Sequence, residues 1–81
     1  MARVLLFGRL ADVAGWRERT FDPTPPRLST LRSQVASQSA ELAAALAGAG
    51  VLAAVDRALV RGDPALGSGA EVAFMPPMSG G

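Results

Sequence analysis

The chain has 81 residues and a formal net charge of +1, with eight basic and seven acidic side chains. It contains no cysteine, histidine, lysine or tyrosine, so every basic side chain is an arginine. These absences exclude a thiolate nucleophile, a Ser-His couple, a transition-metal cluster, a disulfide framework and a Schiff-base lysine. The length predicts one domain with a small core. An enzyme acting alone would therefore depend on carboxylates, arginines, hydroxyls or backbone groups.

The distribution of charge and hydrophobicity also restricts the partners. The arginines are scattered along the sequence, whereas a nucleic-acid binder needs clustered cations. The apolar stretches are far shorter than the roughly 20 residues that a membrane span requires, and no signal peptide is recognisable at the start. We expect a cytoplasmic protein that binds neither nucleic acid nor a membrane, and we expect no metal site.

The first part of the sequence predicts a strand, about one helical turn, a second strand and a stiff proline-rich connection, over residues 3–7, 9–15, 16–21 and 22–26. The first strand is β-rich and is bounded by Gly8. Because side chains alternate along a strand, we expect Leu5 and Phe7 to form an outward-facing pair. The two strands should pair as a hairpin-like unit.

The middle of the sequence is helical. Apolar residues recur at spacings of 3, 4, 7 and 4 between residues 28 and 46, which is helical periodicity. Ser29 or Thr30 is the expected N-cap. The stretch fits either one helix or two, because Ser37 and Ser39 are able to end one helix and cap the next.

The last part predicts strands over residues 51–55, 58–60 and 71–75, with a tight turn at Asp56-Arg57 between the first two. The order of two strands, helix and further strands indicates an α+β fold. We expect the β-grasp, ubiquitin-like arrangement: a mixed sheet of four or five strands packed on one main helix. That domain would occupy residues 1–75.

Residues 76–81 read Pro-Pro-Met-Ser-Gly-Gly and predict an extended tail. Two prolines stop the strand ladder, and six residues span about 20 Å when extended. Gly80 and Gly81 have no side chain, so the end is thin enough to thread a narrow channel and to place the α-carboxylate of Gly81 in the active site of another protein. The alternative is an ordinary frayed terminus.

The ending resembles that of a known family, the small subunit of molybdopterin synthase, a ubiquitin-like sulfur carrier. The similarity lies in EVAFMPPMSGG over residues 71–81 and in LAAVD over residues 52–56. Three positions depart from the family pattern. Met75 replaces an aromatic residue, Met78 replaces a smaller one, and Asp56 replaces the usual turn asparagine.

The resemblance implies a mechanism in which the protein is not an enzyme on its own. A ubiquitin-activating-like adenylyltransferase would use ATP to adenylate the Gly81 carboxylate, and a sulfur donor would convert it to a thiocarboxylate. The tail would then enter the large, catalytic subunit of molybdopterin synthase and give its sulfur to cyclic pyranopterin monophosphate. No tightly bound cofactor is expected in the carrier.

The same resemblance raises the expectation of a docking surface for the partner. The expected partner-binding residues are Leu5, Phe7, Leu59, Met75, Pro76, Pro77, Met78 and Ser79. The alternative is that these are ordinary core or scattered surface residues. Two other functions stay open: a sulfur carrier for thiamine, tRNA thiolation or cysteine synthesis, and a ubiquitin-like protein modifier.

Overall fold

Five strands and three helices make up residues 1–77, the part of the chain that the computed structural model describes. In chain order they are β1 (Ala2–Leu6), α1 (Arg9–Ala14), β2 (Glu18–Phe21), α2 (Leu28–Ala36), α3 (Ala40–Leu46), β3 (Leu52–Val55), β4 (Ala58–Val60) and β5 (Glu71–Met75). All strands expected from the sequence are present, and so is the short helix after the first strand.

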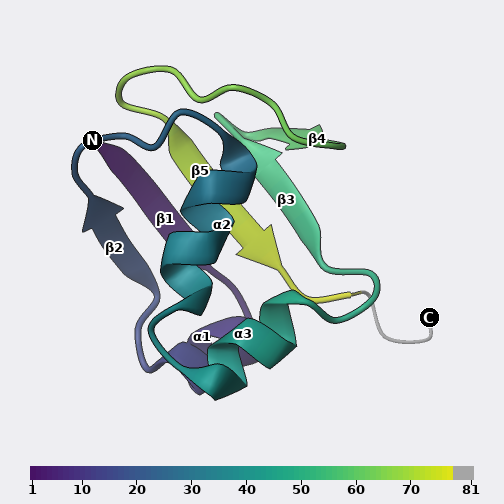
Figure 1. Cartoon of the computed structure of the whole chain (residues 1–81). Coiled ribbons are helices and arrows are strands. Elements are labelled where there is room, and N and C mark those ends of the chain that lie inside the picture. Colours follow the sequence, from purple (N-terminus) through teal and green to yellow (C-terminus); the bar gives the residue numbers. More distant parts are fainter. Residues whose placement is uncertain (78–81) are drawn as a thin grey trace.

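The strands form one mixed sheet in the order β2-β1-β5-β3-β4 (Figure 1). The last strand of the chain, β5, therefore lies in the centre, parallel to β1 and antiparallel to β3. The outer pairs, β1 with β2 and β3 with β4, are antiparallel. This topology places the end of β5 between two other strands and fixes where the predicted tail leaves the sheet.

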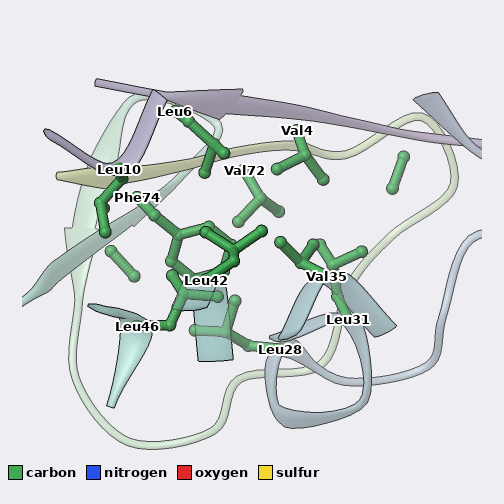
Figure 2. Packing of buried hydrophobic residues seen from close by; sticks show 12 residues of the cluster. Val4, Leu6, Leu10, Leu28, Leu31, Val35, Leu42, Leu46, Val72 and Phe74 are labelled. Atoms are coloured by element: carbon green, nitrogen blue, oxygen red, sulfur yellow. The ribbon is translucent and has the colours of Figure 1, made fainter. Parts of the chain in front are cut away.

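Helix α2 crosses one face of the sheet, which we call the inner face, and α3 lies next to α1 at one end of the sheet (Figure 1). Figure 2 shows strand side chains meeting helix side chains in this core. The sheet and α1 contribute Val4, Leu6, Leu10, Val72 and Phe74, and the two main helices contribute Leu28, Leu31, Val35, Leu42 and Leu46. All of these are buried. The apolar residues that alternate along the strands and those that recur at helical spacing thus form a single core.

The helical stretch is two helices, which settles an alternative that the sequence left open. The first ends at Ala36, and the second begins after Ser39, whose hydroxyl accepts a hydrogen bond of 3.0 Å from the Leu42 N–H. This is the side-chain cap that serine favours at a helix N-terminus. The sheet accordingly packs on one longer and one shorter helix, in place of the single main helix that was expected.

The predicted N-cap of α2 is wrong. The helix begins at Leu28 with Arg27 at the N-cap position, and neither Ser29 nor Thr30 has that role. The cap comes from Asp63, in the connection between β4 and β5, whose Oδ1 accepts from the Ser29 N–H at 2.7 Å. A carboxylate distant in sequence therefore satisfies a free N–H of the first turn and opposes the positive end of the helix dipole.

The turn between β3 and β4 is the one that the sequence predicts. Asp56 and Arg57 both have positive φ, 50° and 71°, as a two-residue hairpin turn of type I′ requires. Asp56 Oδ1 also accepts from the Glu71 N–H at 3.0 Å, which joins this turn to the start of β5. The arrangement as a whole is the β-grasp, ubiquitin-like fold. Within residues 1–77, none of the helices has the length and apolar character that crossing a membrane demands.

Candidate functional site

The predicted reactive tail leaves the domain from the central strand. Phe74 is fully buried in the core and its carbonyl accepts from the Phe7 N–H at 3.2 Å. The next residue, Met75, ends β5 and is half-buried, as is Pro76, whereas Pro77 is exposed. The tail is therefore anchored by one of the most deeply buried side chains in the molecule, and the chain reaches the surface within three residues.

The two prolines lie beside a shallow pocket on the helical side of the sheet. The walls of this pocket come from α1, α3 and the connection between α3 and β3. Apolar side chains predominate among them, including Leu10, Val13, Ala45 and Val51. Pro76 and Pro77 complete the lining. The start of the tail thus rests on the domain before it departs.

The face of the sheet opposite the helices, which we call the outer face, carries an apolar surface. Strand register places Leu5 beside Ala73, Ala73 beside Ala54, and Met75 beside Leu52. Leu59 of β4 lies opposite Ala54 of β3. Phe7 follows the end of β1 and continues its alternation, so its side chain is on the same face as that of Leu5. We define the outer apolar face as Leu5, Phe7, Leu52, Leu59, Ala73 and Met75.

This surface agrees with the predicted outward positions and enlarges them. Phe7 and Leu59 are exposed, at 47% and 68%, while Leu5 and Met75 are half-covered by their neighbours. Leu52, exposed at 42%, and the half-buried Ala73 were not foreseen. The alternation of side chains along residues 51–55 was a signal that could have placed Leu52 on the outer face. Its place beside Met75 depends on the pairing of β3 with β5, which the sequence does not specify.

The end of the outer face that is remote from the tail is charged. Arg3 forms an ion pair with Glu71 and lies 3.7 Å from a Glu18 carboxylate oxygen. Arg57 lies 3.7 Å from the second oxygen of Glu71. Exposed pairs of this kind add little to stability. Because β5 runs from Glu71 toward Met75, the outer face changes from polar to apolar in the direction of the tail.

The remaining predicted residues, Met78, Ser79, Gly80 and Gly81, lie outside the described residues. Within residues 1–77 no three acidic side chains are grouped so that they could hold a metal ion. Glu71 and Glu18 take part in ion pairs with arginine, and Asp63 caps a helix. What the arrangement can offer a partner is an apolar surface that adjoins the root of the tail.

Comparison with known proteins identifies relatives across the whole chain. The model of the ThiS family matches residues 4–81. The molybdopterin synthase sulfur carrier subunit of Escherichia coli (strain K12) is 38% identical over 81 residues, which is 100% of both chains. The aligned relative therefore shares the full length, including the residues of the predicted tail.

The fold is also found in solved structures. A crystal structure of small archaeal modifier protein 1 from H. volcanii has a TM-score of 0.84 and 20% identity, covering 95% of this chain and 97% of the other. A crystal structure of SAMP1 from Haloferax volcanii has a TM-score of 0.85 and 23% identity, covering 99% and 98%. At these identities the likeness concerns the fold alone.

Proposed function

Since the chain belongs to the ThiS family, we propose that it is the sulfur-carrier subunit of a molybdopterin synthase. The observation that carries the proposal is the full-length match, at 38% identity, to a protein named molybdopterin synthase sulfur carrier subunit. The composition supports the same function, because a carrier whose reactive group is a C-terminal carboxylate needs no cysteine, histidine or lysine of its own.

The proposed chemistry takes place at the Gly81 carboxylate in two steps. An activating enzyme catalyses attack of a carboxylate oxygen on the α-phosphate of ATP, which releases pyrophosphate and leaves an acyl-adenylate. Sulfide released by a sulfur donor then attacks the acyl carbon through its sulfur and expels AMP, so that a thiocarboxylate remains. A carboxylate is a poor acyl donor, and the mixed anhydride with AMP makes the acyl carbon reactive. The thiocarboxylate then supplies sulfur for the dithiolene of molybdopterin.

The proposal divides the work between this chain and its partners. The carrier binds no cofactor tightly and is not an enzyme by itself; ATP belongs to the activating enzyme, and the transfer to cyclic pyranopterin monophosphate takes place in a large catalytic subunit. Holding the sulfur on a tethered tail replaces the diffusion of a labile reagent by a positioned transfer. Gly80, with no side chain, allows the narrow approach that this transfer needs.

The outer apolar face is the proposed docking surface for the large subunit. Phe7 and Leu59 are large apolar side chains that are exposed in the free domain, and contiguous exposed apolar surface commonly marks a site of protein interaction. Half-buried Met75 joins this surface to Pro76 at the root of the tail. A partner bound there would therefore lie next to the tail that it receives.

The protein modifier is the less favoured function. The modifier structures share the fold at 20% and 23% identity, which does not extend to their roles. Carriers for thiamine, tRNA thiolation or cysteine synthesis would use the same tail chemistry. The identity of the 38% relative favours the molybdopterin pathway.

Deletion of Gly81 tests the proposal. In a reconstituted reaction with the activating enzyme, a sulfur donor and the large subunit, we expect the truncated chain to form no molybdopterin while its thermal unfolding is unchanged. Gly67→Ala is the matched control, because nothing lies within 4 Å of a side chain placed there, and it should retain full activity. Molybdopterin formation by the truncated chain would overturn the proposal.

A further inference from the structure

Two glycines flank the two prolines at the root of the tail. The parallel pairing of β1 with β5 runs from Arg3 beside Glu71 to Leu6 beside Phe74, and the same register continued by two residues places Gly8 beside Pro76. The antiparallel pairing of β3 with β5 begins at Leu52 beside Met75, and its continuation places Gly50 beside Pro77. Each proline thus has a glycine as its neighbour across the sheet, one on either side.

The glycines are in close contact with the prolines. A Cβ atom added at Gly8 would lie 3.0 Å from Pro76 Cγ, and one added at Gly50 would lie 2.8 Å from Pro77 Cβ. Both glycines have positive φ, 55° and 83°. By contrast, nothing lies within 4 Å of a Cβ added at Gly15, Gly62, Gly67 or Gly69. Among these glycines, only Gly8 and Gly50 therefore lie so close to a proline of the tail that a side chain would collide with it.

The prolines explain why steric contact matters here. Proline has no N–H, so Pro76 and Pro77 cannot donate to a strand on either side. On the β1 side, the Phe7 N–H still donates to the Phe74 carbonyl. Beyond that point the direction of the chain depends on the fixed φ of the prolines and on the main chains packed against their rings.

We propose that Gly8 and Gly50 are positioning residues that set the direction in which the tail leaves the domain. Because neither has a side chain, the connection after β1 and the connection before β3 close on Pro76 and Pro77 from opposite sides. A side chain at either position would displace a stiff ring. At Gly50 the ring would have to move by about 0.6 Å to restore an ordinary contact of 3.4 Å.

The consequence for adenylation of the Gly81 carboxylate, which we call loading of the carrier, rests on the proposed function. If the tail delivers a carboxylate to a distant active site, the position and direction of Pro77 set the point from which its last residues start. Misplacement by about 1 Å is able to reduce a positioned reaction by about 100-fold. Substitution at these glycines should therefore slow loading of the carrier even though neither glycine touches the reacting atoms.

The test compares Gly50→Ala with Gly15→Ala in the full chain. Gly15 has the same φ of 83° but open space around it, so the control places alanine at the same positive φ without the contact. The direct readout is the one-bond Cα–Hα residual dipolar couplings of Pro76 and Pro77 relative to those of β5. We expect G50A to change the Pro77 coupling and G15A to leave both unchanged. Unchanged couplings in G50A would overturn the proposal.

A second readout follows the reaction. At a temperature where both variants are folded, kcat/KM for adenylation by the activating enzyme should fall about ten-fold or more in G50A and stay within about two-fold in G15A. Equal values would overturn the functional consequence. If the unchanged chain is not adenylated at all, the proposed function fails, whereas the dipolar couplings still decide whether the glycines orient the tail.

A second variant covers the case in which G50A does not fold. Gly8→Ala meets only Pro76 Cγ at close range, and Pro76→Ala removes that atom. Because Gly8 has φ 55° and ψ −132°, alanine strains the backbone in both backgrounds. We therefore expect G8A to change the couplings of the tail root and to lower kcat/KM more in the presence of Pro76 than in the P76A background. Equal effects of G8A in both backgrounds would show that the contact does not position the tail.

Discussion

The two faces of the central sheet are built from the same strands but differ in what their side chains contact. On the inner face, Val72 and Phe74 of β5 are fully buried beneath the helices. On the outer face, Ala73 and Met75 of the same strand are half-buried in a surface that includes the exposed Phe7 and Leu59. Successive side chains of this one strand therefore point alternately into the helical core and toward the outer apolar face.

This difference separates stability from recognition. An isolated domain gains most of its folding free energy from apolar area removed from water, which the inner face supplies. Apolar side chains left on the outer face contribute little until a partner covers them, and contiguous exposed apolar surface commonly marks an interaction site. Substitutions on the two faces should consequently affect different measurements.

The largest expected effect is loss of stability from Phe74→Ala. Phe74 is fully buried, and the Arg32 guanidinium lies 5.5 Å from its ring centroid. Truncation should cost about 3–5 kcal/mol, which is a large part of the stability of a small domain at roughly 0.05–0.15 kcal/mol per residue. Denaturant unfolding measures the change.

Phe7→Ala is the matched control, since it removes the same side chain from the outer face. It should cost no more than about 1 kcal/mol. Equal losses of stability for the two phenylalanines would remove the distinction between the faces.

Leu59→Asp should cause a smaller free-energy change, and this change should affect binding to the large subunit but not folding. Leu59 is 68% exposed, so the change should leave the unfolding temperature nearly unaltered. Placing a charge in the outer apolar face should weaken binding to the large subunit by about 30-fold, or about 2 kcal/mol. Calorimetric titration of the two subunits checks this.

Ser33→Asp on α2 serves as the control, because Ser33 is exposed on the helical side. It should bind as the unchanged chain does. If Ser33→Asp weakened binding and Leu59→Asp did not, the partner would bind the helical side instead.

The smallest expected effect concerns the cap that Asp63, in the connection between β4 and β5, provides for helix α2. The Ser29 N–H and hydroxyl, together with the Arg27 guanidinium, hold the pKa of the Asp63 carboxyl below its usual range. A depressed pKa in the folded state contributes stability that is present above the unfolded pKa, about 3.9, and is lost as the pH falls through the folded value.

Asp63→Asn should therefore lower the unfolding temperature by a few degrees at neutral pH. The difference from the unchanged chain should begin to shrink as the pH falls below the unfolded pKa. It should close once the pH falls through the lower folded pKa, because the native carboxyl is then protonated as well. Thermal melts across this pH range follow the difference. A difference that stays constant with pH would show that the carboxylate charge has no part in the cap.

Much of the fold was predictable because it depends on local patterns. Strand alternation in residues 3–7 and 71–75 identified the buried and outward positions, and the turn at Asp56-Arg57 and the ends of α1 followed from residue type. A break at Ser37 or Ser39 was one of two alternatives, and Ser39 caps the second helix. In each case the residues that determine the structure are neighbours in the sequence.

The features that were missed depend on contacts between distant segments. Asp63 replaces the expected serine or threonine cap of α2 from 34 residues away. Leu52 joins the outer apolar face only because β3 pairs with β5. Gly8 and Gly50 read as ordinary strand and helix boundaries until the register places them beside Pro76 and Pro77. A single sequence does not specify these pairings.

The most direct test of the proposed function is the intact mass of the chain after incubation with the activating enzyme, ATP and a sulfur donor. We expect a gain equal to one exchange of oxygen for sulfur, located by fragmentation at Gly81 and absent when ATP is withheld. A chain that keeps its original mass under these conditions, or that gains sulfur at another position, would contradict the account.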